Sequence, residues 1–349
     1  MSKIIFVDGT KGFSPQRLAS KPCGGIITSL TIIPQYLAKE GHDVTVLSLH
    51  EVVEEVNGVK YIHGIPEDQP NDYDVAVFNR NMLNNALADY FEASYKIWWL
   101  HDIVDPTYMQ DESFRRMNKI VALSHYNVKS YSDFYSLPVA LFATIPNGVD
   151  KSVFKPNGEF EYNPSLFICA SAPVKGLYPL QFTFLNLKRV CPEAELRLYT
   201  SQSLHELEDS EGHKKMLSKL AELGVNVLPP ITQGELAKVM QNARALLMPN
   251  HYPEICSNLL LQAQACGLPV VASDIGSANE FIVHGETGLL TSCYPHDMFW
   301  WHKSFAEQTM RILTDEALYM NIHIKAPKNV FSWEQIGEEW NKMIEGSNN

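Results

Sequence analysis

The sequence predicts an α/β protein of two Rossmann-like domains, each a doubly wound parallel sheet, and three observations lead to this class. Short apolar runs typical of buried strands alternate with helical spacing along most of the 349 residues. One segment rich in Pro, Gly and Asn, residues 150–164, interrupts the alternation. The chain on either side of that segment is long enough for a domain of ordinary size.

The first 50 residues show the repeating unit of this fold. Residues 3–9 (KIIFVDG) and 43–49 (DVTVLSL) are apolar runs that predict strands. Between them a helix is expected, because apolar side chains recur at helical spacing: Ile26, Ile27, Leu30, Ile33 and Leu37. A strand, a helix and a strand in this order form a right-handed crossover, which makes the sheet parallel.

Similar runs continue the pattern on both sides of the interruption. Further strands are expected at 74–79, 96–101, 119–124, 139–146, 166–172, 194–200, 225–230, 245–250 and 269–274. We therefore predict a first domain at 1–155 and a second at 156–330, with a last helix, 331–349, that packs back on the first. The two domains would face each other across a cleft at the carboxyl ends of both sheets, where such proteins bind ligands.

Composition restricts the partners and the compartment. The net charge of −12 disfavours nucleic acid and anionic membranes. No apolar run approaches the ~20 residues that span a bilayer, and the N-terminus lacks the order of a signal peptide. Six cysteines form no C-x-x-C pair, which favours reduced thiols over a disulfide framework or a zinc site. We expect a cytoplasmic protein without stable membrane insertion.

The segment PEICSNLLLQAQACGLPVVAS, residues 253–273, carries the strongest candidate site. Ser257 and Asn258 favour a helix start, so Glu254 is expected in the loop before it. The backbone amides of residues 255–258, from Ile255 and Cys256 through Asn258, would then attract a diphosphate. Gln262, further along the helix, would reach neutral hydroxyls. Compensation of the helix dipole by Glu254 is the competing explanation.

Three other positions are candidates at ends of predicted strands or helices. Lys175 precedes a glycine between a strand and a helix, where it would pair with a phosphate, although, taken alone, an exposed surface lysine is the favoured interpretation. Gly24 and Gly25 open the first long helix, either as a close approach to a ligand or as a plain tight turn. His101 ends an aromatic strand, either as a hydrogen-bonding group or as a buried core histidine. Asp102 and Asp105 beside it are typical of turns and caps.

Taken in order along the chain, these motifs resemble the retaining glycosyltransferases of family 4 (group 1), which have the GT-B architecture. The resemblance rests on CGGI before the first helix, LHD after the aromatic strand, IPNGVD at 145–150, and VKG. Its most specific part is the block that begins at Pro253 and continues through ACGLPVVASDIG to GETGLL. It spans essentially the whole chain and implies a nucleotide-sugar-dependent hexosyltransferase.

The resemblance implies a role for each candidate residue. Lys175, Glu254 and His101 would be the catalytic residues: Lys175 holds the donor diphosphate, Glu254 the sugar hydroxyls, and His101 the sugar near the transferring centre. Gln262 would bind the ribose, and Gly24 and Gly25 would cover the phosphates. Such enzymes need no metal or other cofactor; the donor is UDP-, GDP- or ADP-linked and the acceptor a carbohydrate or a lipid-linked glycan.

Three departures from the family pattern keep alternatives open. Gln262 stands where the family usually has a second glutamate. The family usually has an arginine a few residues before the lysine, where this chain has Ala170 and Ser171. It often has glycines after the next strand, and the corresponding segment here, LRLYTSQS, has none. A nucleotide-sugar epimerase of the same architecture, and a weakly active or non-catalytic sugar-binding relative, are the alternatives to transfer.

Overall fold

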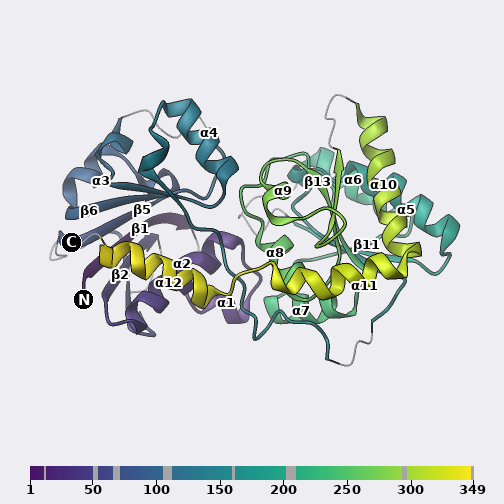
Figure 1. The fold of residues 1–349 in the computed structure, drawn as a ribbon, viewed down its shortest axis with the longest axis horizontal. Helices are drawn as coiled ribbons and strands as arrows, with labels where there is room; N and C mark the ends of the chain where they lie inside the picture. Colours follow the sequence, from purple (N-terminus) through teal and green to yellow (C-terminus); the bar gives the residue numbers. More distant parts are fainter. Residues whose placement is uncertain are drawn as a thin grey trace. The chain divides into compact units, whose positions relative to one another are not determined.

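The computed structural model describes residues 1–11, 13–49, 54–65, 71–104, 112–158, 162–201, 210–292 and 297–346. The chain forms two compact units (Figure 1). The first unit consists of Met1–Leu18, Gly25–Gly148 and Trp333–Asn349, and the second of Ala19–Gly24 and Val149–Ser332. Each unit contains one sheet.

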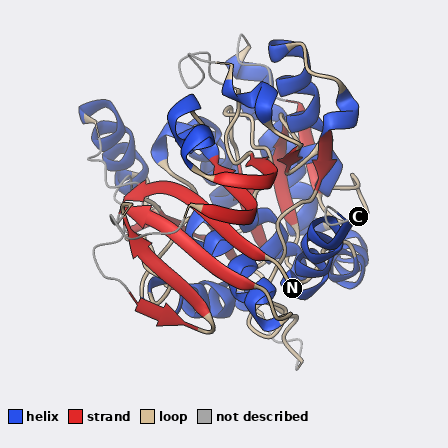
Figure 2. Cartoon of the chain, turned by 90° about the vertical axis from the view of Figure 1, so that its left-hand side faces the viewer, coloured by secondary structure: helices blue, strands red, loops and turns tan. Residues whose placement is uncertain are grey.

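The first unit is built on an eight-stranded sheet of order β3-β4-β2-β1-β5-β6-β7-β8, whose twist is visible in Figure 2. Every neighbouring pair is parallel except β3 and β4. Its strands are β1 (Lys3–Lys11), β2 (Asp43–Leu49), β3 (Glu54–Val56), β4 (Val59–His63), β5 (Asp72–Asn79), β6 (Glu92–Trp99), β7 (Lys119–Ala122) and β8 (Phe142–Thr144).

The helices of the first unit are α2 (Gly25–Lys39), α3 (Asn85–Tyr90), α4 (His125–Tyr135) and the C-terminal α12 (Trp333–Gly346), and the short α1 (Arg17–Ser20) crosses into the second unit. Helix α12 packs on α2 and on the sheet. Its Trp340 ring lies 4.8 Å from that of Trp99 and 6.2 Å from that of Phe6. Asn341 on the same helix hydrogen bonds through Oδ1 to His42 Nε2 at 2.7 Å. Residues at the two ends of the chain thus share one core.

The second unit has a six-stranded, fully parallel sheet of order β11-β10-β9-β12-β13-β14. Its strands are β9 (Leu166–Ala170), β10 (Glu195–Tyr199), β11 (Asn226–Leu228), β12 (Ala245–Met248), β13 (Val270–Asp274) and β14 (Leu289–Ser292). The order runs outward in one direction from β9 and in the other from β12. These two adjacent strands therefore form the topological switch point, where ligands bind beyond the carboxyl ends.

The helices that cover this sheet bury an apolar core of aliphatic and aromatic side chains, such as Phe167, Leu247 and Phe305. They are α5 (Tyr178–Val190), α6 (Glu211–Glu222), α7 (Gln233–Asn242), α8 (Asn258–Ala265), α9 (Ala278–Phe281), α10 (Met298–Thr314) and α11 (Glu316–Lys325). Within the described part of the chain, no helix has the length and apolarity needed to cross a membrane.

The predicted fold class, with two Rossmann-like parallel sheets, is confirmed. One predicted strand is wrong in part. Residues 139–146 were expected to be extended, but Val139–Leu141 form a short 3₁₀ helix (η3) and only Phe142–Thr144 pair with β7. Val139 is 65% exposed, so no burial favours an extended conformation at the start of this apolar run.

Candidate active site

The site lies at the switch point of the second unit, in the two loops that follow β9 and β12. Because these strands are parallel neighbours, both loops leave the same edge of the sheet. The backbone N–H of His251 in the second loop donates to the carbonyl of Lys175 in the first, at 2.9 Å. The Ser171 hydroxyl donates to Asn250 Oδ1 at 3.3 Å. These two contacts fasten one loop to the other.

An ion pair connects the two loops through charged side chains. Lys175 ends the 3₁₀ turn η4 (Pro173–Lys175), and its Nζ lies 2.7 Å from Glu254 Oε1. Asn250 Nδ2 donates to the same oxygen at 3.1 Å. The side chains of Lys175 and Glu254 are 30% and 19% exposed, so both remain accessible to a ligand. The structure therefore brings together two of the predicted catalytic residues.

The backbone of Glu254 is held in place by the loop after β13. Its carbonyl accepts hydrogen bonds from the N–H and the hydroxyl of Ser277, at 2.8 and 2.9 Å. Gly276 pairs with Glu254 in an isolated bridge at a φ of +65°, and a Cβ there would overlap the Glu254 backbone. Only glycine allows this close approach. The carboxylate is thus presented from a fixed position.

Helix α8 begins directly after the loop that carries Glu254, with Ser257 as its N-cap and Asn258 as its first residue. The Ser257 hydroxyl makes no capping hydrogen bond, and the buried Asn258 Oδ1 has no partner. Ile255 and Cys256 are each 7% exposed. A cavity of about 20 Å³, lined by Glu254, Ser257 and Ser277 among others, lies beside the helix start and is large enough for about one water molecule.

Gln262 lies on α8 and is 9% exposed. Two residues later, Gln264 is fully buried and donates to the carbonyls of Phe281 and Thr287 at 2.8 and 3.2 Å. Gln264 therefore has a structural role, as a hydrogen-bond donor inside the second unit. Gln262 remains a candidate for contact with the ribose.

His101, the third predicted catalytic residue, follows β6 in the first unit. Its ring lies 4.4 Å from that of Trp99, and its buried Nε2 has no partner. Burial, with a smaller contribution from the charge of Arg80, lowers the pKa of His101 to about 3. The imidazole is consequently neutral at physiological pH. The neighbouring Asp102 forms an ion pair with Arg80 Nε at 2.6 Å, while Asp105 lies outside the described residues.

The paired glycines fall at a division between the units. Gly25 is the first residue of α2 in the first unit, whereas Gly24 groups with the second unit. A Cβ at Gly24 would meet no atom within 4 Å. Packing therefore does not require glycine at this position.

A polar pair, Asp8 within β1 and Asn79 at the end of β5, was missed by the sequence analysis. Asp8 is 1% exposed, and its carboxylate accepts from Asn79 Nδ2 at 2.6 Å and from the Thr10 N–H at 2.7 Å. Burial raises the pKa of Asp8. The available signal was the polar residue at the end of each apolar run, IIFVD and VAVFN. Strands β1, β5 and β6 are neighbours, so this pair and His101 follow the same edge of the first sheet.

The second unit is similar in sequence to known glycosyltransferases. Residues 166–315 match the family Glycosyl transferases group 1. A D-inositol 3-phosphate glycosyltransferase of Pseudarthrobacter chlorophenolicus is 30% identical over 178 residues, which are 48% of this chain and 40% of that protein. The chain thus aligns with less than half the length of this relative.

Two solved structures resemble the whole chain. Sucrose-phosphate synthase from Thermosynechococcus elongatus aligns with a TM-score of 0.78 and 17% identity, over 99% of this chain and 98% of that one. Anabaena Alr3699/HepE in complex with UDP and glucose aligns with a TM-score of 0.74 and 17% identity, over 99% and 100%. Both similarities show the fold.

Proposed function

We propose that this protein transfers a hexose from a nucleotide-diphosphate sugar to a hydroxyl group, with retention of anomeric configuration. The match of residues 166–315 to the group 1 glycosyltransferases supports this proposal. One observation carries the proposal. At the switch point of the second sheet, a lysine and a glutamate from adjacent loops meet at 2.7 Å, beside the start of a helix. That arrangement provides a cation, helix amides and a carboxylate at the edge where an α/β sheet binds nucleotides.

The chemistry follows from the charges that develop during transfer. The bond from the anomeric carbon to the diphosphate breaks, the sugar becomes oxocarbenium-like, and negative charge builds on the leaving phosphate. The Lys175 ammonium and the amides at the start of α8 stabilise that charge. The acceptor hydroxyl then bonds to the anomeric carbon, and its proton passes to the departing phosphate.

The remaining residues bind the sugar and the nucleoside in this proposal. Glu254 accepts hydrogen bonds from donor-sugar hydroxyls, and Lys175 shifts from Glu254 toward the diphosphate when the donor arrives. Gln262 hydrogen bonds to the ribose. His101 contacts the sugar as a neutral imidazole, in keeping with its lowered pKa, and Gly24 and Gly25 cover the phosphates.

The donor is UDP-, GDP- or ADP-linked, and the similar Anabaena protein was solved with UDP and glucose. The acceptor is a carbohydrate or a lipid-linked glycan. We place the reaction in the cytoplasm, because five described cysteines are free thiols, as in proteins of reducing compartments. No metal takes part in this proposal, since Lys175 and helix amides meet the diphosphate charge.

Incubation of the protein with UDP-, GDP- and ADP-sugars tests the proposal. Nucleotide release that requires an acceptor, with a product of retained anomeric configuration by NMR, is the expected result. An altered sugar still attached to its nucleotide would indicate epimerisation instead, and binding without turnover would indicate a non-catalytic protein. Activity should survive EDTA; loss that magnesium or manganese restores would refute the metal-free mechanism.

A further inference from the structure

We propose that His251 is a positioning residue that fixes Lys175 for the donor diphosphate. This inference rests on the proposed function, since it assigns the support of a residue in the same site. His251 follows β12 and lies three residues before Glu254, outside the motifs to which the sequence analysis gave a role. Both its backbone and its ring contact the turn that carries Lys175.

His251 contacts two adjacent residues of that turn. The His251 N–H donates to the Lys175 carbonyl at 2.9 Å. The ring lies against the next residue, Gly176, so closely that a Cβ at Gly176 would overlap it. Gly176 has a φ of +97°, a conformation that side-chain-bearing residues rarely adopt. The turn therefore needs glycine for two reasons, and the imidazole occupies the space that glycine leaves.

The imidazole of His251 also contacts two aromatic side chains, Trp301 and Tyr178. Its ring centroid lies 6.3 Å from that of Trp301 and 5.9 Å from that of Tyr178. Trp301 is 1% exposed, and its Nε1 donates to Ser273 Oγ on β13 at 3.0 Å. A continuous set of contacts thus runs from β13 through Trp301 and His251 to the Lys175 turn. Such support limits how far the lysine backbone can move.

The ring acts through its shape. His251 Nδ1 is buried and has no hydrogen-bond partner. An unpaired buried nitrogen adds no stability, so an apolar ring of similar size should fill the place as well. This expectation separates a positioning role from direct contact between the imidazole and the ligand.

Adjacent residues hold the two members of the ion pair. Asn250 donates to the Glu254 carboxylate at 3.1 Å, and His251 holds the Lys175 backbone. Ala170 and Ser171, which precede Lys175 in the same loop region, supply no second cation. Lys175 is therefore the cation that these two loops offer to a diphosphate. The position of its ammonium group should strongly affect nucleotide affinity, because a small displacement of a binding group weakens its contact with the ligand.

Three variants test the inference: His251→Ala, His251→Phe and, as a matched control, His302→Ala. His302 also lies beside Trp301, with ring centroids 5.8 Å apart, and also has a buried nitrogen without a partner. Affinities for UDP, GDP and ADP are measured by calorimetry for each full-length protein. The ammonium signal of Lys175 is recorded by NMR without nucleotide, to report its pairing with Glu254.

We expect His251→Ala to weaken nucleotide binding about tenfold, the scale of coupling between contacting residues, and His251→Phe and His302→Ala to bind as the unaltered protein does. The loss should disappear when Lys175→Ala is already present, since His251 acts through Lys175. Normal binding by His251→Ala, equal losses in the Ala and Phe variants, or a loss that persists without Lys175 would overturn the inference.

The ligand-free NMR measurement keeps the two proposals apart. The Lys175 signal should lose its ion-pair character in His251→Ala and keep it in His251→Phe. That result, together with no binding of any of the three nucleotides to the unaltered protein, would refute the proposed function and leave the positioning role supported. An unchanged Lys175 signal in His251→Ala would overturn the positioning role whatever the nucleotide data show.

Discussion

The two ends of strand β12 use polar groups in opposite ways. At its amino end, Arg244 is 2% exposed and nearly all its donors are occupied. At its carboxyl end, Lys175 and Glu254 are partly exposed, and buried atoms of His251 and Asn258 have no partner. One four-residue strand thus separates a saturated network from an unsaturated one.

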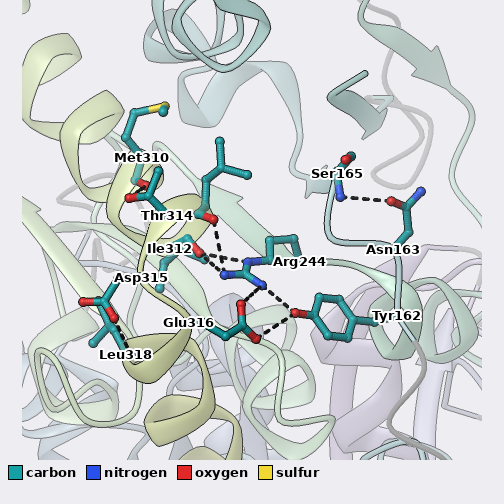
Figure 3. A network of polar contacts seen from close by, with 11 residues as sticks. Tyr162, Asn163, Ser165, Arg244, Met310, Ile312, Thr314, Asp315, Glu316 and Leu318 are labelled. Atoms are coloured by element: carbon teal, nitrogen blue, oxygen red, sulfur yellow. Dashed lines mark hydrogen bonds and ion pairs between the residues drawn. The ribbon is translucent and has the colours of Figure 1, made fainter. Parts of the chain in front are cut away.

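The amino end is a structural clamp (Figure 3). Arg244 donates through Nε and Nη2 to the Ile312 carbonyl at 2.8 and 2.6 Å, which satisfies the last turn of α10. Its Nη1 reaches Tyr162 and Glu316 at 2.5 and 2.7 Å, and the guanidinium lies 4.2 Å from the Tyr319 ring centroid. Since each group already has a partner, nothing is left to bind a ligand.

At the carboxyl end of β12, the buried His251 Nδ1 and Asn258 Oδ1 have no hydrogen-bond partner. Buried polar atoms without partners are rare in folded proteins, and they concentrate where a ligand or water completes the network. The comparison teaches that polar density alone does not identify a site. The distinguishing features are unfilled capacity and partial exposure.

The largest expected effect is on stability, from the amino end. Arg244→Met should lower the free energy of unfolding by about 3 kcal/mol, because carbonyls of α10 and the Tyr162 hydroxyl lose a buried partner. Glu316→Gln is the control and should cost below about 1 kcal/mol, since Glu316 is 61% exposed. Chemical denaturation measures both. Equal, small losses would mean that Arg244 is not a clamp.

Lys175→Ala should have the opposite effect to Arg244→Met, because it should weaken ligand binding and leave stability nearly unchanged. Removing a charge-assisted contact should weaken binding of the nucleoside diphosphate by about 1.5–3 kcal/mol. The unfolding free energy should change little, because the ion pair with Glu254 is partly exposed. Calorimetric titration together with denaturation decides the matter. Full affinity in a folded variant would exclude a diphosphate role for this lysine.

His101, which follows β6 in the first sheet, should affect activity more than ligand binding. His101→Ala should lower turnover more than it weakens nucleotide binding, because a group near the sugar contacts the transition state. With its pKa lowered to about 3, His101 remains neutral from pH 5 to 8, so it should add no step to the turnover profile there. Steady-state kinetics of both proteins across this range provide the check. Unchanged turnover in the variant would assign His101 to the core.

Gln262→Glu should give the smallest change. A carboxylate accepts a stronger hydrogen bond from a ribose hydroxyl than an amide does, so nucleotide affinity should rise by about 0.5–1.5 kcal/mol. Position 262 is only 9% exposed, so the new charge must be desolvated and the unfolding free energy should fall. Equal affinity of both forms would show that residue 262 does not contact the ribose.

Local sequence patterns and motifs were sufficient to predict both sheets and two of the residues that meet at the candidate site. Strand periodicity predicted both sheets, and the motifs around Lys175 and Glu254 led to the group 1 glycosyltransferase family, which residues 166–315 match. A hairpin between β3 and β4 was missed, although Asn57-Gly58 is its typical signal; these residues have φ of 50° and 77°.

Contacts between distant residues could not be predicted in this way. Lys175 and Glu254 are 79 positions apart, and Arg244 and Ile312 are 68 apart. Such pairs depend on side-chain directions and strand order, which a single sequence does not specify. The same holds for His251, whose importance becomes visible only when Gly176 and Trp301 are seen around it.

The most direct test of the central claim is a map of backbone amide chemical shifts as UDP, GDP and ADP are each titrated into the full-length protein. With at least one nucleotide, we predict that the shifts concentrate at the carboxyl end of β12 and its partner loop, in residues 171–176 and 250–258. Residues 312–316 beside Arg244 should stay unchanged. Shifts centred on 312–316, or no shifts with any of the three nucleotides, would contradict the account.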